Sequence, residues 1–173
     1  FFTAMLDNCP VVDTFYQNGY ILHATSMSPF GPFSNGSEVL PNWSTQPEIH
    51  FDPSSGTYVL MHSRFDSMKK RTNGQIAAFP CGKDGRKAPP PEGFDPKPKG
   101  SLMERNVSLA YSKSLDGPWE CCLDVSLDSY MANPTILIHR NGSVVLTWRG
   151  SKGLSTGFAP SIHGPFRLAG ASP

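Results

Sequence analysis

Short runs of alternating apolar and polar residues follow one another along this chain, and turn-forming residues separate them. The clearest example begins at Asn133 and predicts four consecutive antiparallel strands, at 135–139, 144–148, 154–159 and after a corner at Gly164-Pro165-Phe166. Asn141-Gly142 is the strongest short signal for a tight hairpin between the first two strands. A four-stranded antiparallel meander of this size is typical of one blade of a β-propeller.

The same pattern occurs twice before Asn133. One copy predicts strands at 46–51, 57–62 and 107–112 and a fourth after a corner at Gly117-Pro118-Trp119. The other predicts strands at 11–16 and 20–26 and a corner at Gly31-Pro32-Phe33, which is only the second half of a blade. We expect a polar loop at 34–45, and residues 1–9 are too short a stretch to assign.

The three Gly-Pro corners recur at a spacing that fits a repeat. Gly31 and Gly117 are 86 residues apart, and Gly117 and Gly164 are 47 apart. The longer interval contains a segment rich in Pro, Gly and Lys at 65–106, and without those 42 residues it shrinks to 44. Propeller blades repeat at roughly 40–50 residues. We therefore interpret 65–106 as an insertion within a blade.

No segment shows a sustained helical period, so the fold class expected is all-β. We expect residues 1–173 to form one partial domain, with about two and a half four-stranded blades of a five-bladed propeller. A closed propeller needs at least four blades, so the chain is interpreted as a fragment of a longer one. A complete small β-sandwich is the alternative.

Charge and hydropathy argue against two classes of partner, nucleic acids and membranes. The net charge is +1 and 17% of residues are charged, which does not favour nucleic acid as a partner. No apolar run approaches the length of roughly 18 residues that a membrane helix needs, so no membrane partner is expected. The remainder of the propeller, from the same parent chain, is the protein partner that the fragment interpretation predicts.

Asn-X-Ser sequons are frequent and favour a secreted or extracellular glycoprotein. They begin at four positions: Asn35, Asn42, Asn106 and Asn141. Turn chemistry is the alternative explanation for them, most strongly for Asn141, which already belongs to the predicted hairpin.

The chain has four cysteines, Cys9, Cys81, Cys121 and Cys122. An even number in a secreted chain indicates disulfides, with three pairings open. Cys121 and Cys122 are neighbours in a predicted strand, so their side chains are expected on opposite faces and are not expected to serve one partner. Without a C-x-x-C pair, no metal site is predicted.

The corner segments carry a resemblance to a known group of proteins. Residues 24–33 read ATSMSPFGPF, residues 110–119 read AYSKSLDGPW, and residues 133–150 read NPTILIHRNGSVVLTWRG. An X-Pro strand opening, a Gly-containing hairpin and an S-x-S-x-x-G-P-[FW] corner resemble the five-bladed propeller glycoside hydrolases of the family 43 type and its relatives in families 32, 62, 68 and 117. The resemblance covers roughly residues 20–166 outside the insertion.

The resemblance implies a site at the axis, where the innermost strands of the blades begin. Active members use carboxylates on several inner strands, with no cofactor in the bond-breaking step. Glu48 is the candidate catalytic carboxylate, and a solvated or Arg-paired carboxylate is its alternative. Strand alternation places Gln46, Glu48 and His50 on one face. Asn133 stands where the family has Asp, and an amide cannot act as a base.

Further substrate-binding candidates lie where second strands end. Arg64 and Arg149 are candidates for hydrogen bonds to sugar hydroxyls, and Trp148 for stacking on a pyranose ring. Core packing of Trp148 and a structural ion pair for Arg149 are the alternatives. Gln46, His50 and Asn133 complete the predicted substrate-binding set. Some relatives hold a structural calcium ion, but this sequence shows no ligand cluster for one.

Two functions follow from these observations. The first is a carbohydrate-active, glycoside hydrolase-like propeller that hydrolyses or binds an extracellular oligo- or polysaccharide. The second is a non-catalytic extracellular propeller that binds a glycan or a protein. The amide at Asn133 favours the second function, and the resemblance favours the first.

Overall fold

The protein is all-β in the computed structural model, which describes residues 1–5, 19–40, 44–64 and 106–169. Within these ranges, eleven strands form three antiparallel sheets. The first sheet contains β1 (Phe2–Met5), β2 (Gly19–His23) and β3 (Ser37–Leu40), with β2 in the centre. These described residues contain no helix, and so none that would span a membrane.

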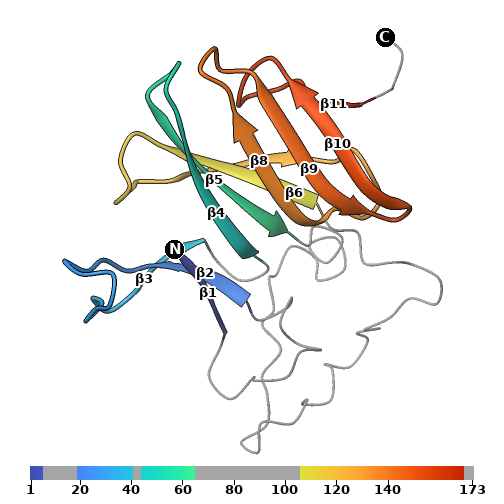
Figure 1. Cartoon of the computed structure of the whole chain (residues 1–173). Helices are drawn as coiled ribbons and strands as arrows, with labels where there is room; N and C mark the ends of the chain where they lie inside the picture. Colours follow the sequence, from blue (N-terminus) through green and yellow to red (C-terminus); the bar gives the residue numbers. More distant parts are fainter. Residues whose placement is uncertain (6–18, 41–43, 65–105, 170–173) are drawn as a thin grey trace, which may run out of the picture.

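The other two sheets are four-stranded meanders in chain order. One contains β4 (Ser44–Asp52), β5 (Thr57–Arg64), β6 (Asn106–Ser112) and β7 (Glu120–Val125). The other contains β8 (Ala132–Ile138), β9 (Val144–Gly150), β10 (Gly153–Ala159) and β11 (Arg167–Leu168). Figure 1 shows the two meanders lying beside each other, with the first sheet on the other side of β4 and β5. The strands predicted in these two copies are therefore confirmed.

The beginning of the chain differs from the prediction. The polar loop expected at 34–45 contains β3 and the start of β4, and the unassigned N-terminal stretch contributes β1. β1 and β3 become strands because both pair with β2, and their own sequences carry little alternation. The strand predicted at 11–16 and the insertion predicted at 65–106 lie outside the described residues, apart from Asn106, which begins β6.

The hairpin between β8 and β9 turns at the predicted place. His139 to Gly142 form a four-residue turn in which the Gly142 N–H donates to the His139 carbonyl at 2.9 Å, and the His139 N–H donates to Ser143 at 2.8 Å. Gly142 has φ +83°, a conformation that favours glycine. The Asn-Gly signal thus located the turn correctly.

The three Gly-Pro corners have one geometry. Gly31, Gly117 and Gly164 have φ between +84° and +90°, and each precedes a cis proline. Each glycine N–H also donates to the carbonyl of the serine three residues before it, at 3.0, 3.2 and 3.0 Å. The repeat inferred from spacing is therefore a repeat of backbone conformation as well.

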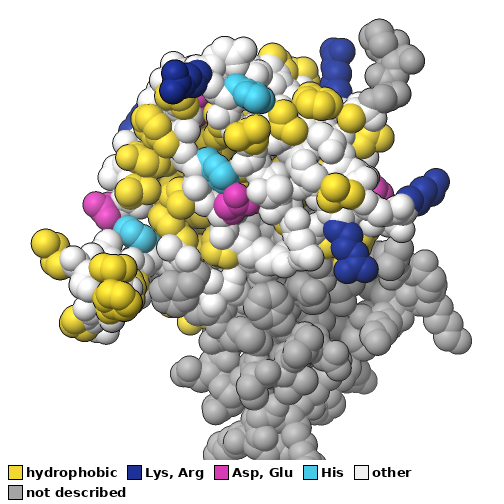
Figure 2. All heavy atoms as spheres, viewed as in Figure 1, with side chains coloured by type: hydrophobic (Ala, Val, Ile, Leu, Met, Phe, Trp, Pro, Cys, Tyr) yellow, Lys and Arg dark blue, Asp and Glu magenta, His cyan; other side chains and the backbone are white. Residues whose placement is uncertain are grey.

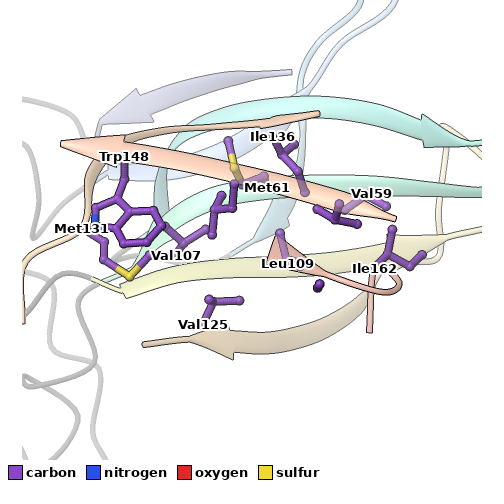
Figure 3. Close-up of a cluster of buried hydrophobic side chains, with 12 residues drawn as sticks. Val59, Met61, Val107, Leu109, Val125, Met131, Ile136, Trp148 and Ile162 are labelled. Atoms are coloured by element: carbon purple, nitrogen blue, oxygen red, sulfur yellow. The ribbon is translucent and has the colours of Figure 1, made fainter. Parts of the chain in front are cut away.

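The main hydrophobic core lies between the two four-stranded sheets (Figure 3). Val59, Met61 and Leu109 from one sheet meet Ile136 and Trp148 from the other. A smaller core lies on the opposite face of the β4–β7 sheet, against the first sheet, and contains Ile21, Leu40, Leu60 and Ala110. The β4–β7 sheet is therefore buried on both faces.

Candidate functional site

The starts of β4 and β8 have matching conformations and meet. Gln46 and Asn133 precede prolines and have φ +57° and +47°, and the strand register shifts at both places. The Gln46 side chain donates from Nε2 to Asn133 Oδ1 at 2.7 Å. Each residue lies in the edge strand of its own sheet. The structure thus brings together two residues predicted to share a site.

Two further hydrogen bonds hold Gln46, one through its side chain and one through its backbone. Ser63 Oγ donates to Gln46 Oε1 at 2.8 Å, and the Gln46 backbone N–H donates to Thr3 Oγ1 at 3.0 Å. Thr3 lies in β1, so this one residue is bonded to all three sheets. The amide group is consequently held in a defined orientation at the point where the sheets meet.

Glu48 and His50 form the next part of this edge. His50 Nε2 lies 2.7 Å from Glu48 Oε1, and Thr135 Oγ1 on β8 donates to the same oxygen at 3.1 Å. The side chain of His50 is 25% exposed and that of Glu48 is 36% exposed, so both are accessible to a ligand. Figure 2 shows histidine and acidic side chains next to each other on the viewed face. We call Gln46, Glu48, His50, Asn133 and Thr135 the inter-sheet edge.

The predicted alternation is confirmed only in part. Glu48 and His50 share a face and touch, but a bulge between Thr45 and Glu48 separates Gln46 from their regular register. A β-bulge inserts a residue and changes the direction of the side chains on either side of it. Gln46 still reaches the site, through Asn133 rather than through the strand alternation. Thr135 was missed because its contact crosses between sheets.

Asp52 is the other carboxylate on β4. It lies four residues beyond Glu48, which corresponds to about 13 Å along a strand. Although burial raises the pKa of Asp52, hydrogen bonds from Ser55 and Ser54 outweigh that effect and hold the pKa below its ordinary value. Asp52 is therefore occupied at the β4–β5 turn, where Gly56 N–H donates to its carbonyl at 2.9 Å.

Trp148 does not lie at the inter-sheet edge. Its side chain is 0% exposed and packs beside Met131 in the main core (Figure 3). A sugar therefore has no access to the indole face, and the prediction that Trp148 stacks on a pyranose ring was wrong. The alternative, core packing, is what the structure shows.

The two arginine candidates have different environments. Arg64 is half-buried at the end of β5, and its Nη1 lies 3.5 Å from Asp124 Oδ1 on β7. Asp124 Oδ1 also accepts a hydrogen bond from Ser108 Oγ. Arg149 is exposed on β9, opposite Ala132. Arg64 is therefore engaged within its own sheet, whereas Arg149 extends to the surface.

The sequons occupy different positions. Asn35 is exposed and Asn106 is half-buried at the start of β6. Asn141 Oδ1 accepts from the backbone N–H of Ser143 at 3.1 Å and from its hydroxyl at 2.8 Å. Asn141 thus has the turn role given as the alternative explanation. Asn42 lies outside the described residues.

Sequence reasoning missed a cluster of sulfur and nitrogen ligands between the first two sheets. Cys121 and Cys122 form a disulfide, and Cys122 Sγ lies 3.7 Å from Nε2 of His62 on β5. The expectation that the two cysteines would face opposite ways was wrong, because a register shift between Leu109 and Tyr111 interrupts the alternation of β7 at this point. Burial lowers the pKa of His62 from 6.5 to about 4, so its imidazole is neutral at pH 7. The adjacent cysteine pair was the available signal. Cys9 and Cys81 lie outside the described residues.

A cavity of about 510 Å³ lies near the opposite end of β4, beyond Asp52. Its lining includes Ser55, Tyr111, Lys113 and His163. Lys113 Nζ donates to the Ser55 carbonyl at 2.8 Å, and Tyr111 OH donates to the Ile162 carbonyl at 2.8 Å. Burial raises the pKa of Tyr111. The Tyr111 bond joins the two four-stranded sheets and the Lys113 bond lies within the β4–β7 sheet, so these polar atoms are used in structure.

Comparison with known proteins adds no assignment to this geometry. A scan against protein-family models finds no match, and a search of curated proteins finds no similar sequence.

Proposed function

We propose that this chain is part of an extracellular β-propeller and that the inter-sheet edge binds an oligo- or polysaccharide. The observation that carries the proposal is the hydrogen bond between Gln46 and Asn133, which joins the equivalent starts of two neighbouring edge strands. Amides, a carboxylate, an imidazole and a hydroxyl at one place are the polar groups that recognise sugar hydroxyls. The resemblance of the corners to propeller glycoside hydrolases supports the same substrate class.

The packing of the sheets supports a radial arrangement with further sheets. Phe158 has the same place in the β8–β11 sheet as Tyr111 has in the β4–β7 sheet, because each pairs with the valine at the matching position, Val145 or Val59. Tyr111 packs against the next sheet, whereas Phe158 is 49% exposed. Leu137, beside Val145, is 56% exposed. A further sheet would cover this apolar face in the way that the last sheet covers Tyr111.

Hydrolysis requires more than the described inner strands supply. Glycosidases place two carboxyl groups roughly 5–9.5 Å apart, and Glu48 and Asp52 are about 13 Å apart along β4. Among the described residues, β8 carries no acidic side chain. Glu48 is therefore one carboxylate of a catalytic pair only if its partner comes from outside β4 and β8.

Non-catalytic binding is the second candidate function, and Asn133 favours it. Its amide holds Gln46 at the point where the resemblance implies a catalytic Asp. An amide at that point keeps hydrogen bonding to sugar hydroxyls but provides neither a base nor a negative charge. The inter-sheet edge is thus suited to recognition even where no bond is cleaved.

Binding and hydrolysis are tested together on the full chain with a panel of immobilised polysaccharides. We expect retention of at least one polysaccharide and a loss of about tenfold or more in affinity for Glu48→Gln, since hydrogen bonds to charged groups contribute roughly 1.5–3 kcal/mol. Glu38→Gln, at an exposed position on β3, is the matched control. Release of reducing ends that Glu48→Gln abolishes would assign hydrolysis. Failure of the wild-type chain to retain any polysaccharide would overturn the proposal.

A further inference from the structure

A second site lies away from the inter-sheet edge, on the face of the β4–β7 sheet that is turned to the first sheet. One ligand atom from each of His62, Cys121 and Cys122 lies within 4.8 Å of the other two. His62 comes from β5 and the cysteines from β7, so the fold, not sequence proximity, brings the imidazole to the sulfurs. Two sulfurs and an imidazole are the ligands that thiophilic cations prefer.

We propose that the dithiol form of Cys121 and Cys122, together with His62, binds a divalent cation of the zinc class. Tetrahedral zinc with Zn–S of about 2.3 Å and Zn–N of about 2.05 Å sets its sulfur and nitrogen ligands roughly 3.6 Å apart. His62 Nε2 and Cys122 Sγ are 3.7 Å apart. The imidazole therefore stands at coordination distance before any ion is bound.

The burial of His62 determines which of its nitrogens could bind an ion. Its side chain is 0% exposed, and among the described residues Nδ1 has no hydrogen-bond partner. A buried polar ring without adequate partners is unfavourable, and such groups commonly mark a functional role or a missing ion. An ion would bind at Nε2, the nitrogen that faces the sulfurs, and this coordination would leave Nδ1 without a partner.

Access to the cluster is one-sided. Cys121 is exposed, Cys122 is half-buried and His62 is buried, so an ion would enter from the side of Cys121. Three protein ligands leave a fourth position for water or an exogenous ligand, as in zinc sites that remain open. The site would thus bind an exchangeable ion.

The oxidation state of the cysteines decides whether the site is formed. The structure joins Cys121 and Cys122 in a disulfide, in which neither sulfur is a thiolate. A phosphine or dithiol reductant supplies two electrons, and two protons from water complete the two thiols. The cation then displaces both thiol protons to solvent and is held by two thiolates and the neutral imidazole. A disulfide reagent that accepts two electrons and leaves as two thiols would re-form the Cys121–Cys122 bond and release the ion.

Titration with Co²⁺, a spectroscopic substitute for zinc, tests the proposal on the full chain after reduction with a phosphine. We expect one equivalent of Co²⁺ to produce a thiolate-to-cobalt charge-transfer band and tetrahedral d–d bands, and one equivalent of Zn²⁺ to remove them. The unreduced protein should show neither. The double variant Cys121→Ser/Cys122→Ser should lose the charge-transfer band, while Cys9→Ser/Cys81→Ser, the matched control, should keep it.

His62→Gln separates a three-ligand site from a simple dithiol. We expect it to weaken Zn²⁺ binding by at least about tenfold, a loss that even changes outside the coordination shell can produce. Where His62→Gln fails to fold, protection decides instead: bound Zn²⁺ should slow alkylation of Cys121 and Cys122 in the wild type. A charge-transfer band that persists in the Cys121→Ser/Cys122→Ser variant, or thiols that react equally fast with and without Zn²⁺, would overturn the proposal.

Discussion

Gln46 and Asn133, 87 residues apart in the sequence, join two sheets by a side-chain hydrogen bond of 2.7 Å, and both hold a positive φ. Such a conformation is uncommon for residues other than glycine, although Asn tolerates it better than most. Each residue precedes a proline that restricts its backbone to extended conformations in ordinary contexts. Two unusual backbone positions in direct contact indicate that the structure around them maintains this geometry, which is frequent at functional sites.

Asn133→Ala and Asn133→Gly separate the hydrogen bond from the backbone conformation. Both substitutions remove the acceptor for Gln46, but only alanine has a Cβ that is sterically strained at φ +47°. We expect Asn133→Gly to be more stable than Asn133→Ala by roughly 1 kcal/mol or more in urea unfolding. Equal stabilities would show that the backbone of Asn133 is not constrained as described.

Gln46→Ala tests whether the edge acts as a unit. It removes the donor to Asn133 and leaves the Ser63 hydroxyl, which is buried, without its acceptor. We expect a loss of about 1–3 kcal/mol in the free energy of unfolding, because a buried polar group loses its partner. In a double-mutant cycle with Asn133→Ala, the two losses should not add. Strict additivity would contradict a direct interaction.

Gly142→Ala addresses the contact between the β8–β9 turn and the β4–β5 turn. A Cβ at Gly142 would collide with Ser54 Oγ, and φ is +83°. Gly56→Ala is the matched control, since φ is +63° and no atom lies within 4 Å of the added Cβ. We expect backbone strain at positive φ to lower the free energy of unfolding by roughly 1–2 kcal/mol in both variants. Gly142→Ala should lose more because of the collision with Ser54. Ser54→Ala also removes a hydrogen bond to Asp52, so it should destabilise Gly56→Ala as much as it destabilises the wild type, and should destabilise Gly142→Ala less.

The elements that sequence reasoning located are those whose signals are local. β9 and β10 follow from β-branched and aromatic alternation, and the Gly-Pro corners follow from residues whose conformational range is narrow. β3 was missed because Ser37 and Glu38 are exposed and carry no periodicity, so pairing with β2 alone makes this segment a strand. Tertiary pairing of that kind leaves no local signal.

Part of the candidate site could also be predicted from the sequence. X-Pro openings identified Gln46 and Asn133, and alternation placed Glu48 beside His50. Alternation along β9 did not decide whether Trp148 is buried or exposed, because either face of a sheet can be packed against another sheet. The His62 cluster depends on a register shift that places two cysteines opposite one residue, and single-sequence patterns do not reveal bulges.

Trp148→Ala should strongly destabilise the pair of four-stranded sheets. The indole is fully buried between them, and removal of a buried tryptophan costs about 3–5 kcal/mol. Phe158→Ala, on the uncovered face of the same sheet, should cost less than about 1 kcal/mol in this chain. Unfolding monitored by far-UV circular dichroism checks both values. A small effect of Trp148→Ala would contradict the core described.

Asp52 gives the protein an acid-dependent component of stability with a defined sign. Hydrogen bonds from Ser54 and Ser55, at 2.6–2.9 Å, favour its charged form and lower its pKa in the folded state despite burial. A carboxyl whose folded pKa is depressed contributes stability above the unfolded pKa of about 4, and the contribution is lost as the pH falls through the folded value.

Asp52→Asn should therefore lower the urea midpoint at pH 7, and the difference from the wild type should shrink steadily between pH 5 and pH 2.5. Glu120→Gln, at an exposed position on β7, is the control and should show no comparable convergence. Urea unfolding at a series of pH values measures both. A difference between Asp52→Asn and the wild type that stays constant down to pH 2.5 would mean that the hydrogen bonds from Ser54 and Ser55 do not favour the carboxylate over the neutral acid.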